Sequence, residues 1–387
     1  MVGISRLCCG TAEASDRLRY RRFDGPPRPV VVFNCTRRCN LRCAHCYSGS
    51  TDAPAADELT TDEAKALIDD LAAMGAPVIL FSGGEPMLRP DLLALIDHAR
   101  HVGLRAVIST NGTFITPTLA QRFKALALGY VGVSLDGLEA THDRFRGERG
   151  AFAAALEGLR HCRAAGVKVG VRLTLTRHNV DELSAVLDLV EREGIPRICF
   201  YHLVAAGRGA ALREDALDAA ATRRAVDTII DRTRDLHARG RRIEVLTVDN
   251  HADGPYLLRR LEREDPDQAR RAMALLKRNR GNASGERIAC VSWDGSVHPD
   301  PFWRAQTLGN VRERPFSAIW ADESIPLLAE LRDRKQHLKG RCRRCRWLEV
   351  CNGNFRARAE AATGDRWADD PACYLTDEEI RPDAPSD

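Results

Sequence analysis

Four cysteines lie within twelve positions of the segment "FNCTRRCNLRCAHCYSGS", residues 33–50. Cys39, Cys43 and Cys46 have the spacing C-x3-C-x2-C, whereas Cys35 precedes them at the end of a predicted strand. Three thiolates on one short loop can ligate three irons of an iron–sulfur cube and leave the fourth iron open to a reactant. The alternative is a structural zinc site, which needs four protein ligands and would recruit Cys35 or His45.

A second group of cysteines lies near the C-terminus, with the spacing Cys342-x2-Cys345-x5-Cys351-x21-Cys373. Four thiolates can fill every iron of a cube, which favours a closed electron-transfer cluster, with zinc as the alternative. The other cysteines show no metal-ligand spacing with close partners, and Cys162 and Cys199 are expected to be small buried residues. No role is assigned to Cys8, Cys9, Cys35 or Cys290.

Between the two groups of cysteines, strand-like and helical patterns alternate. Strands are predicted at 29–33, 77–81, 105–110, 130–136, 168–176 and 197–204, and helices at 59–75, 90–103, 116–129, 150–166 and 179–194. Such alternation predicts an α/β fold with a parallel sheet. A closed eightfold barrel usually needs ~250 residues, so six units predict an open, partial (βα)6 barrel. The candidate site residues follow the strands, at the sheet edge where parallel folds carry out chemistry.

The chain is divided into five predicted parts. They are a lead-in segment (1–28), the partial barrel (29–205), a helical linker (206–285), a smaller cysteine-rich α+β domain (286–376) and a flexible tail (377–387). Within the linker, residues 214–240 have the pattern of an amphipathic helix. The stretch "DQARRAMALLKRNR" predicts a further, exposed helix.

Composition limits the possible partners. The chain has 387 residues, 44% of them hydrophobic, and a formal net charge of +4, which is typical of a globular protein and does not demand nucleic acid. No stretch reaches the roughly 20 apolar residues of a membrane span. The N-terminus turns polar and basic too soon for a secretory signal. We therefore expect a cytoplasmic protein with no nucleic-acid or membrane partner.

The first cysteine loop resembles a known family. C-x3-C-x-aromatic-C, with His45 in the aromatic position, is similar to the signature of the radical S-adenosylmethionine (SAM) enzymes, whose fold is a partial (βα)6 barrel. The resemblance implies that Cys39, Cys43 and Cys46 hold a 4Fe-4S cluster that binds and reduces SAM. The resulting 5′-deoxyadenosyl radical abstracts a hydrogen atom, while the protein supplies orientation and excludes water.

The same resemblance implies the SAM contacts. Gly83, Gly84 and Glu85 in "SGGEP" match the motif that binds the methionine amino group: the glycines allow close backbone approach, and a carboxylate pairs with an ammonium. Ser134 and Arg146 are similar to the residues that hold the SAM carboxylate, for which the arginine fork is suited. Asn111 in "STNGT" is expected to contact the nucleoside.

The C-terminal cysteines resemble the auxiliary-cluster (SPASM/twitch) domain of this family. Phe355 stands where the seven-cysteine pattern has another cysteine, and Cys290 has no obvious partner. We therefore predict one auxiliary 4Fe-4S cluster on Cys342, Cys345, Cys351 and Cys373, and two clusters in the whole chain.

Several segments, including "YVGVSLDGLEATHDRFRG" and "DPACYLTDEE", resemble the haem d1 biosynthesis branch of the family. That resemblance implies a didecarboxysirohaem-type tetrapyrrole whose propionate side chains are attacked, and a flavodoxin or ferredoxin as electron donor. Arg208 and His298 are candidate substrate contacts, and Trp293, Phe302 and Trp303 are candidates for an aromatic wall. The alternatives are oxidative decarboxylation of haem-precursor propionates and maturation of a ribosomal peptide.

Overall fold

One open sheet organises the chain, and the computed structural model describes residues 1–20, 28–53 and 55–381. Its described strands lie in the order β1-β8-β7-β6-β5-β4-β3-β2-β9-β10-β11. They are β1 (Val2–Gly3), β2 (Val30–Thr36), β3 (Ile79–Gly83), β4 (Ala106–Thr110), β5 (Val131–Ser134), β6 (Val169–Leu175), β7 (Arg197–His202), β8 (Glu244–Val248), β9 (Ile288–Val291), β10 (Ser296–His298) and β11 (Gly309–Asn310). Neighbouring strands from β2 to β8 pair in parallel, so the predicted α/β partial barrel is confirmed.

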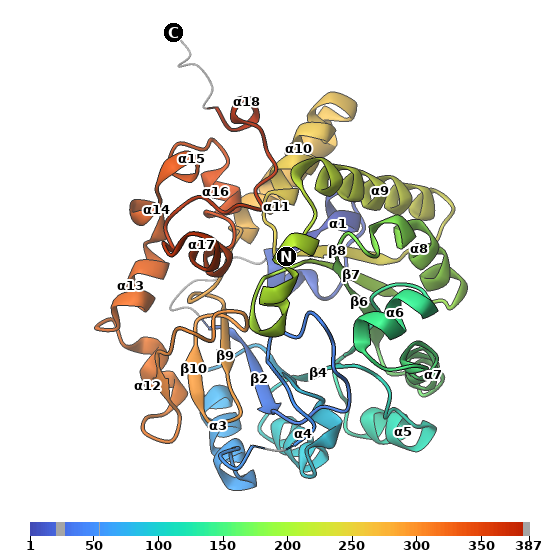
Figure 1. The fold of residues 1–387 in the computed structure, drawn as a ribbon, viewed down its shortest axis with the longest axis vertical. Coiled ribbons are helices and arrows are strands. Elements are labelled where there is room, and N and C mark those ends of the chain that lie inside the picture. The colour runs from blue at the N-terminus through green and yellow to red at the C-terminus, as the bar shows by residue number, and fades with distance from the viewer. Residues whose placement is uncertain (21–27, 54, 382–387) are drawn as a thin grey trace.

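The helices α3 to α9 lie around the outside of the strands, and α12 to α17 lie on the other side, beyond β9 and β10 (Figure 1). The helical elements are α1 (Ile4–Cys9), α2 (Asp16–Tyr20), α3 (Thr61–Ala73), η1 (Pro86–Leu88), α4 (Leu92–His101), α5 (Pro117–Ala125), α6 (Glu139–Arg146), α7 (Ala151–Ala164), η2 (Val180–Glu182), α8 (Leu183–Arg192), η3 (Gly207–Asp215), α9 (Ala219–Ala238), α10 (Asp253–Glu264), α11 (Pro266–Asn279), α12 (Phe316–Ala321), α13 (Pro326–Arg332), α14 (Arg334–His337), α15 (Gly340–Arg343), α16 (Leu348–Cys351), α17 (Arg356–Thr363) and α18 (Asp377–Ile380).

Local sequence explains where these helices begin and which face they bury. A capping box begins α3, because Thr60 accepts a hydrogen bond from the Glu63 backbone N–H and the Glu63 carboxylate accepts one from the Thr60 backbone N–H. In α8, Val186, Leu187 and Val190 are buried at helical spacing, so this helix packs its apolar face on the sheet.

Two regions predicted to lie outside the sheet contribute to it. Residues 1–28 were expected to form a lead-in outside the core, but β1 pairs antiparallel with β8, and Ile4 and Leu7 of α1 are fully buried. The predicted helical linker contains β8, which extends the parallel sheet beyond β7. Helix α11 was expected to be exposed, yet its Ala272 and Leu276 are buried. Strands of two and five residues carry too little periodicity to be recognised from sequence.

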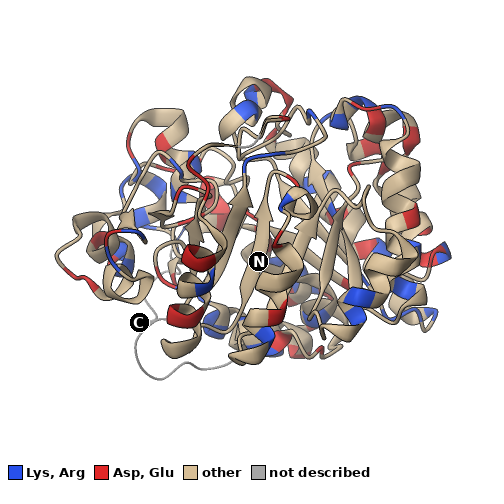
Figure 2. Ribbon diagram, turned by 90° about the horizontal axis from the view of Figure 1, so that it is seen from below, with Lys and Arg blue, Asp and Glu red and all other residues tan. Residues whose placement is uncertain are grey.

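The expected flexible tail is partly ordered. Thr376 and Glu379 form a second capping box, which begins α18, and residues 382–387 lie outside the described part of the chain. No helix in the described ranges is long and apolar enough to cross a bilayer. Basic and acidic residues are interspersed along the outer helices, in keeping with the small net charge (Figure 2).

Candidate active site

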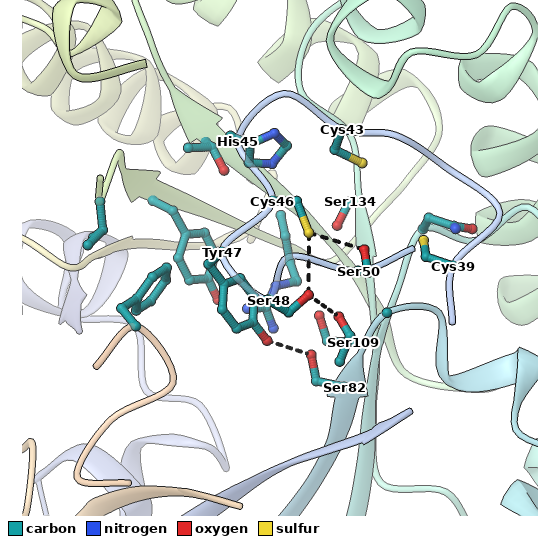
Figure 3. Close-up of a pocket in the computed structure, with 18 of the residues that line it drawn as sticks. Cys39, Cys43, His45, Cys46, Tyr47, Ser48, Ser50, Ser82, Ser109 and Ser134 are labelled. Atoms are coloured by element: carbon teal, nitrogen blue, oxygen red, sulfur yellow. Dashed lines mark hydrogen bonds between the residues drawn. The ribbon is translucent and has the colours of Figure 1, made fainter. Parts of the chain in front are cut away.

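A pocket at the carboxyl ends of the strands brings the first cysteine loop together with most of the predicted SAM contacts (Figure 3). Its empty space is about 900 Å³, which includes space open to solvent. Of the predicted residues, it is lined by Cys39, Cys43, Cys46, Gly83, Gly84, Asn111, Ser134, Arg146 and Phe302. The predicted residues Glu85, Arg208 and His298 are not in its lining.

The three cysteines of the spacing C-x3-C-x2-C face the pocket, whereas Cys35 does not. Cys46 Sγ is 3.3 Å from Ser48 Oγ and 3.2 Å from Ser50 Oγ (Figure 3). Burial opposes ionisation of Cys46, but these hydroxyl contacts prevail and its pKa is lowered. Cys35 lies fully inside the core, where burial raises its pKa to about 12. The donor set therefore fits a cluster held by three thiolates.

The zinc alternative needs His45 or Cys35 as a fourth ligand; Cys35 lies in the core, whereas His45 lines the pocket beside the three cysteines. His45 stacks on Phe145, with ring centroids 4.5 Å apart, and its Nε2 is 3.5 Å from Asp136 Oδ2. Burial lowers the pKa of His45 to about 4. In the part of the chain that the structure describes, no three His, Cys, Asp or Glu side chains are arranged to hold a single metal ion.

Two glycines, Gly83 at the end of β3 and Gly84 directly after it, allow the close approach of the cysteine loop. Gly83 has φ +120°, and a Cβ there would lie 2.5 Å from the Thr36 carbonyl oxygen. A Cβ at Gly84 would lie 2.1 Å from the carbonyl oxygen of Arg38. Any side chain at these positions would push the loop away, so the glycines form part of the pocket wall.

Glu85 was predicted to bind the cofactor directly, but its carboxylate faces the protein. It accepts hydrogen bonds from Thr110 Oγ1 (2.8 Å), the Asn111 backbone N–H (2.8 Å) and the Met87 backbone N–H (3.2 Å). Burial raises the pKa of Glu85 to about 6 although these bonds oppose the shift. In this arrangement Glu85 ties the end of β4 to η1 and so positions the pocket wall.

Ser134, Arg146 and Asn111 line the pocket as expected, and their predicted SAM contacts remain predictions. Arg146 forms an ion pair with Asp136, and its Nη1 is 3.4 Å from Cys43 Sγ. Its Nε is buried without a hydrogen-bond partner in the described residues. Arg146 thus places positive charge against a cysteine that would be anionic in a cluster.

Arg208 was predicted to bind the substrate, but it braces the cysteine loop instead. Its Nε donates to the Cys43 carbonyl (3.1 Å) and its Nη1 to the Ser50 carbonyl (2.5 Å). Its own backbone N–H donates to the Cys46 carbonyl (2.9 Å). Arg208 and the cysteine loop are more than 150 residues apart in the sequence, so this contact could not be predicted from the sequence.

Arg208→Gln is therefore expected to speed the loss of iron from the first cluster several-fold, because two charge-assisted bonds that order the loop are removed. Iron release to a chelator under anaerobic conditions measures this, with the exposed Arg122→Gln as the matched control. Unchanged iron release together with weaker tetrapyrrole binding would instead support the prediction that Arg208 contacts the substrate.

His298 is not among the residues that line the pocket, and no contact in the described part of the chain supports its predicted role as a substrate ligand. It is buried in β10, where its Nε2 is 3.0 Å from Ser292 Oγ and its Nδ1 is 2.9 Å from the Gln306 carbonyl oxygen. Phe302, in contrast, lines the pocket and packs on Tyr47, with ring centroids 5.0 Å apart.

The four C-terminal cysteines line a second cavity. Cys342, Cys345, Cys351 and Cys373 surround it with the apolar side chains of Trp347, Leu348, Leu375 and Ile380. The pKa of Cys351 is raised by burial and by the other three thiols, which shows that the four lie close together. Cys290 is not in this lining: it is buried in β9, where Asn34 Nδ2 is 3.3 Å from its sulfur. Phe355, at the missing cysteine position, packs edge-on against Phe302.

The sequence did not point to two charged residues of the first pocket, Arg172 and Asp249. Arg172 interrupts the apolar pattern of β6, and Asp249 directly follows β8, which was not predicted. Asp249 has a φ of +66°, and its Oδ2 is buried without a hydrogen-bond partner in the described residues. Burial raises the pKa of Asp249 to about 6. Arg172 could have been identified from the sequence as a charged residue within a strand that is otherwise apolar and buried.

Comparisons with known proteins agree with this geometry. Residues 33–190 match the Radical SAM superfamily model, and residues 284–346 match the SPASM model, an iron–sulfur cluster-binding domain. The Fe-coproporphyrin III synthase of Methanosarcina barkeri is 57% identical, over 98% of this chain and 99% of its own. The Pre-heme d1 synthase of Dinoroseobacter shibae is 44% identical, over 91% of this chain and 87% of its own.

The fold has solved counterparts. Streptococcus suis SuiB, solved with its precursor peptide SuiA, superposes with a TM-score of 0.71 over 91% of this chain and 76% of its own, at 16% identity. At that identity the likeness shows the shared fold alone. The family models and the high sequence identity to a relative over nearly the whole chain show the family. The chain belongs to the radical SAM superfamily of enzymes and has a C-terminal SPASM iron–sulfur cluster-binding domain.

Proposed function

We propose that this enzyme modifies side chains of an iron tetrapyrrole on the way to haem. The observation that carries the proposal is the 57% identity over nearly the whole chain to a relative named for the product Fe-coproporphyrin III. The haem d1 relative is similar at 44%, so the haem-precursor alternative is better supported than the haem d1 prediction. Didecarboxysirohaem remains the substrate we propose.

The residues that would carry the chemistry are those that line the two cavities. Cys39, Cys43 and Cys46 would hold the 4Fe-4S cluster that, with SAM bound, supplies the 5′-deoxyadenosyl radical. Gly83 and Gly84 would let the cofactor approach the backbone, and Ser134 with Arg146 would bind its carboxylate. The four C-terminal cysteines would hold a second cluster in an apolar cavity, from which electrons could move to or from the reaction site.

The pocket suits a large, anionic ligand. Its wall combines the aromatic side chains of Tyr47, Tyr201 and Phe302 with the basic side chains of Arg146 and Arg172. A tetrapyrrole presents a wide apolar ring and several carboxylates, which match such a wall.

Release of 5′-deoxyadenosine by reduced, cluster-reconstituted enzyme tests the proposal. Didecarboxysirohaem is expected to raise the rate at least about tenfold over SAM alone, because closure around the substrate excludes water and orients the cofactor. Iron coproporphyrin III and a cysteine-containing peptide serve as parallel substrates. Equal release with and without every tetrapyrrole would reject the proposal, and stimulation by the peptide alone would favour peptide maturation.

A further inference from the structure

Arg172 is a charged side chain inside the barrel. On β6 it lies between Val171 and Leu173, both fully buried toward the helices, and it points to the opposite face. It lines the pocket that contains the cysteine loop and also the cavity beneath it, at the amino ends of the strands. Arg172 therefore lies at the deep end of the candidate active site.

The Arg172 guanidinium makes no hydrogen bond and no ion pair with the described residues, and its contact is with an aromatic ring. Its Cζ lies 4.6 Å from the centroid of the Tyr201 ring, on the neighbouring strand β7. Gly132 on β5 leaves room for it, since a Cβ there would be 2.8 Å from Arg172 Cδ. The side chain is thus held in place by packing, while its donors remain free.

The other arginine that lines this pocket, Arg146, already has an anionic partner in Asp136 and is the proposed contact for the SAM carboxylate. Asp249 also lines the pocket, but it forms no ion pair with Arg172 within the described chain. Burial raises the pKa of Asp249 to about 6, so it is largely ionised at neutral pH, but its charge also acts on the amino terminus and Arg358. A partly buried guanidinium without a hydrogen-bonded anionic partner is costly, and a carboxylate ligand would reduce that cost through two parallel hydrogen bonds.

We propose that Arg172 binds a side-chain carboxylate of the tetrapyrrole substrate at the deep end of the pocket. The inference rests on the proposed function, and it would place one acid side chain of the macrocycle inside the barrel. SAM is the other source of a carboxylate in this pocket, so a test must separate the two.

Equilibrium binding tests the inference with two probes in the reconstituted, unreduced enzyme. The first probe is iron coproporphyrin III, followed by its absorbance and compared with its tetramethyl ester, which lacks the charges. The second is SAM, followed by calorimetry. Arg172→Gln is expected to weaken porphyrin binding about 10- to 100-fold and to remove the preference for the free acid, with SAM affinity unchanged. Arg172→Lys should recover part of the loss, because it keeps the charge but not the fork.

Gly132→Ala gives an independent variant, because its methyl group displaces the Arg172 side chain without removing the charge. It is expected to weaken porphyrin binding severalfold, and Arg122→Gln should bind as the wild type does. Iron content reports whether each variant is folded. If Arg172→Gln binds the porphyrin like the wild type, or loses SAM affinity instead, the inference is wrong while the proposed function stands. If the wild type binds no tetrapyrrole, the proposed function fails, and the ligand assigned to Arg172 fails with it.

Discussion

Cys43→Ala is expected to reduce SAM cleavage to the level of enzyme stripped of iron. In the proposed first cluster three thiolates would act as one unit, so the loss of one should cost as much as the loss of all three. Cys43 faces the pocket, 3.4 Å from Arg146 Nη1, and no nearby thiol could replace it, since Cys35 points into the core. Anaerobic 5′-deoxyadenosine release, measured with iron content, gives the result.

Cys35→Ala is the matched control for this prediction. The Cys35 thiol lies on the same segment but is enclosed by the core, where its sulfur is 3.5 Å from the Ser82 carbonyl oxygen. Removing one buried sulfur should cost about 1–2 kcal/mol of stability and leave iron content and SAM cleavage intact. Iron loss in the Cys35 variant, with iron retained in the Cys43 variant, would contradict the ligand set.

The second large effect concerns the auxiliary cluster. Cys351→Ala is expected to lower the iron content from about eight to about four atoms per chain, because one 4Fe-4S cluster loses a ligand. Tetrapyrrole turnover should fall to background while SAM cleavage without substrate persists, because the two cavities are separate. Iron and sulfide analysis with Mössbauer spectroscopy measures the loss of the second cluster.

Cys290→Ala separates this prediction from a general effect of removing a thiol. Cys290 is buried in β9 and is not among the lining residues of the second cavity, so both clusters should remain. If the iron content fell in the Cys290 variant and not in the Cys351 variant, the predicted ligands of the auxiliary cluster would be wrong.

Much of the fold was readable because its signals are local. The strand positions from β2 to β7 follow from short β-branched runs, and the start of α3 follows from the capping pair Thr60 and Glu63. The cysteine spacing pointed to the first pocket, since residues three or four apart on a loop lie close in space. The second cavity also includes Cys373, which lies 22 positions after Cys351. Phe355, which stands where the seven-cysteine pattern has another cysteine, is buried against Phe302.

What the sequence did not reveal depends on long-range contacts. Arg208 follows β7 at the mouth of the barrel, yet its guanidinium turns back to carbonyls more than 150 residues earlier. Glu85 stands in a recognisable motif, but the direction of its carboxylate is decided by Thr110 and Asn111 at the end of β4. β1 was missed because its pairing partner β8 lies some 240 residues away, and a two-residue strand has no pattern of its own.

Mass spectrometry of the macrocycle tests the central claim most directly. Reduced, reconstituted enzyme would be incubated with SAM and didecarboxysirohaem, and the tetrapyrrole mass would be followed alongside 5′-deoxyadenosine. The account predicts conversion to a species with the mass of Fe-coproporphyrin III, in step with 5′-deoxyadenosine. A product that keeps its side chains in an oxidised form would instead assign the enzyme to haem d1 biosynthesis. An unchanged macrocycle in the presence of 5′-deoxyadenosine would contradict the tetrapyrrole assignment.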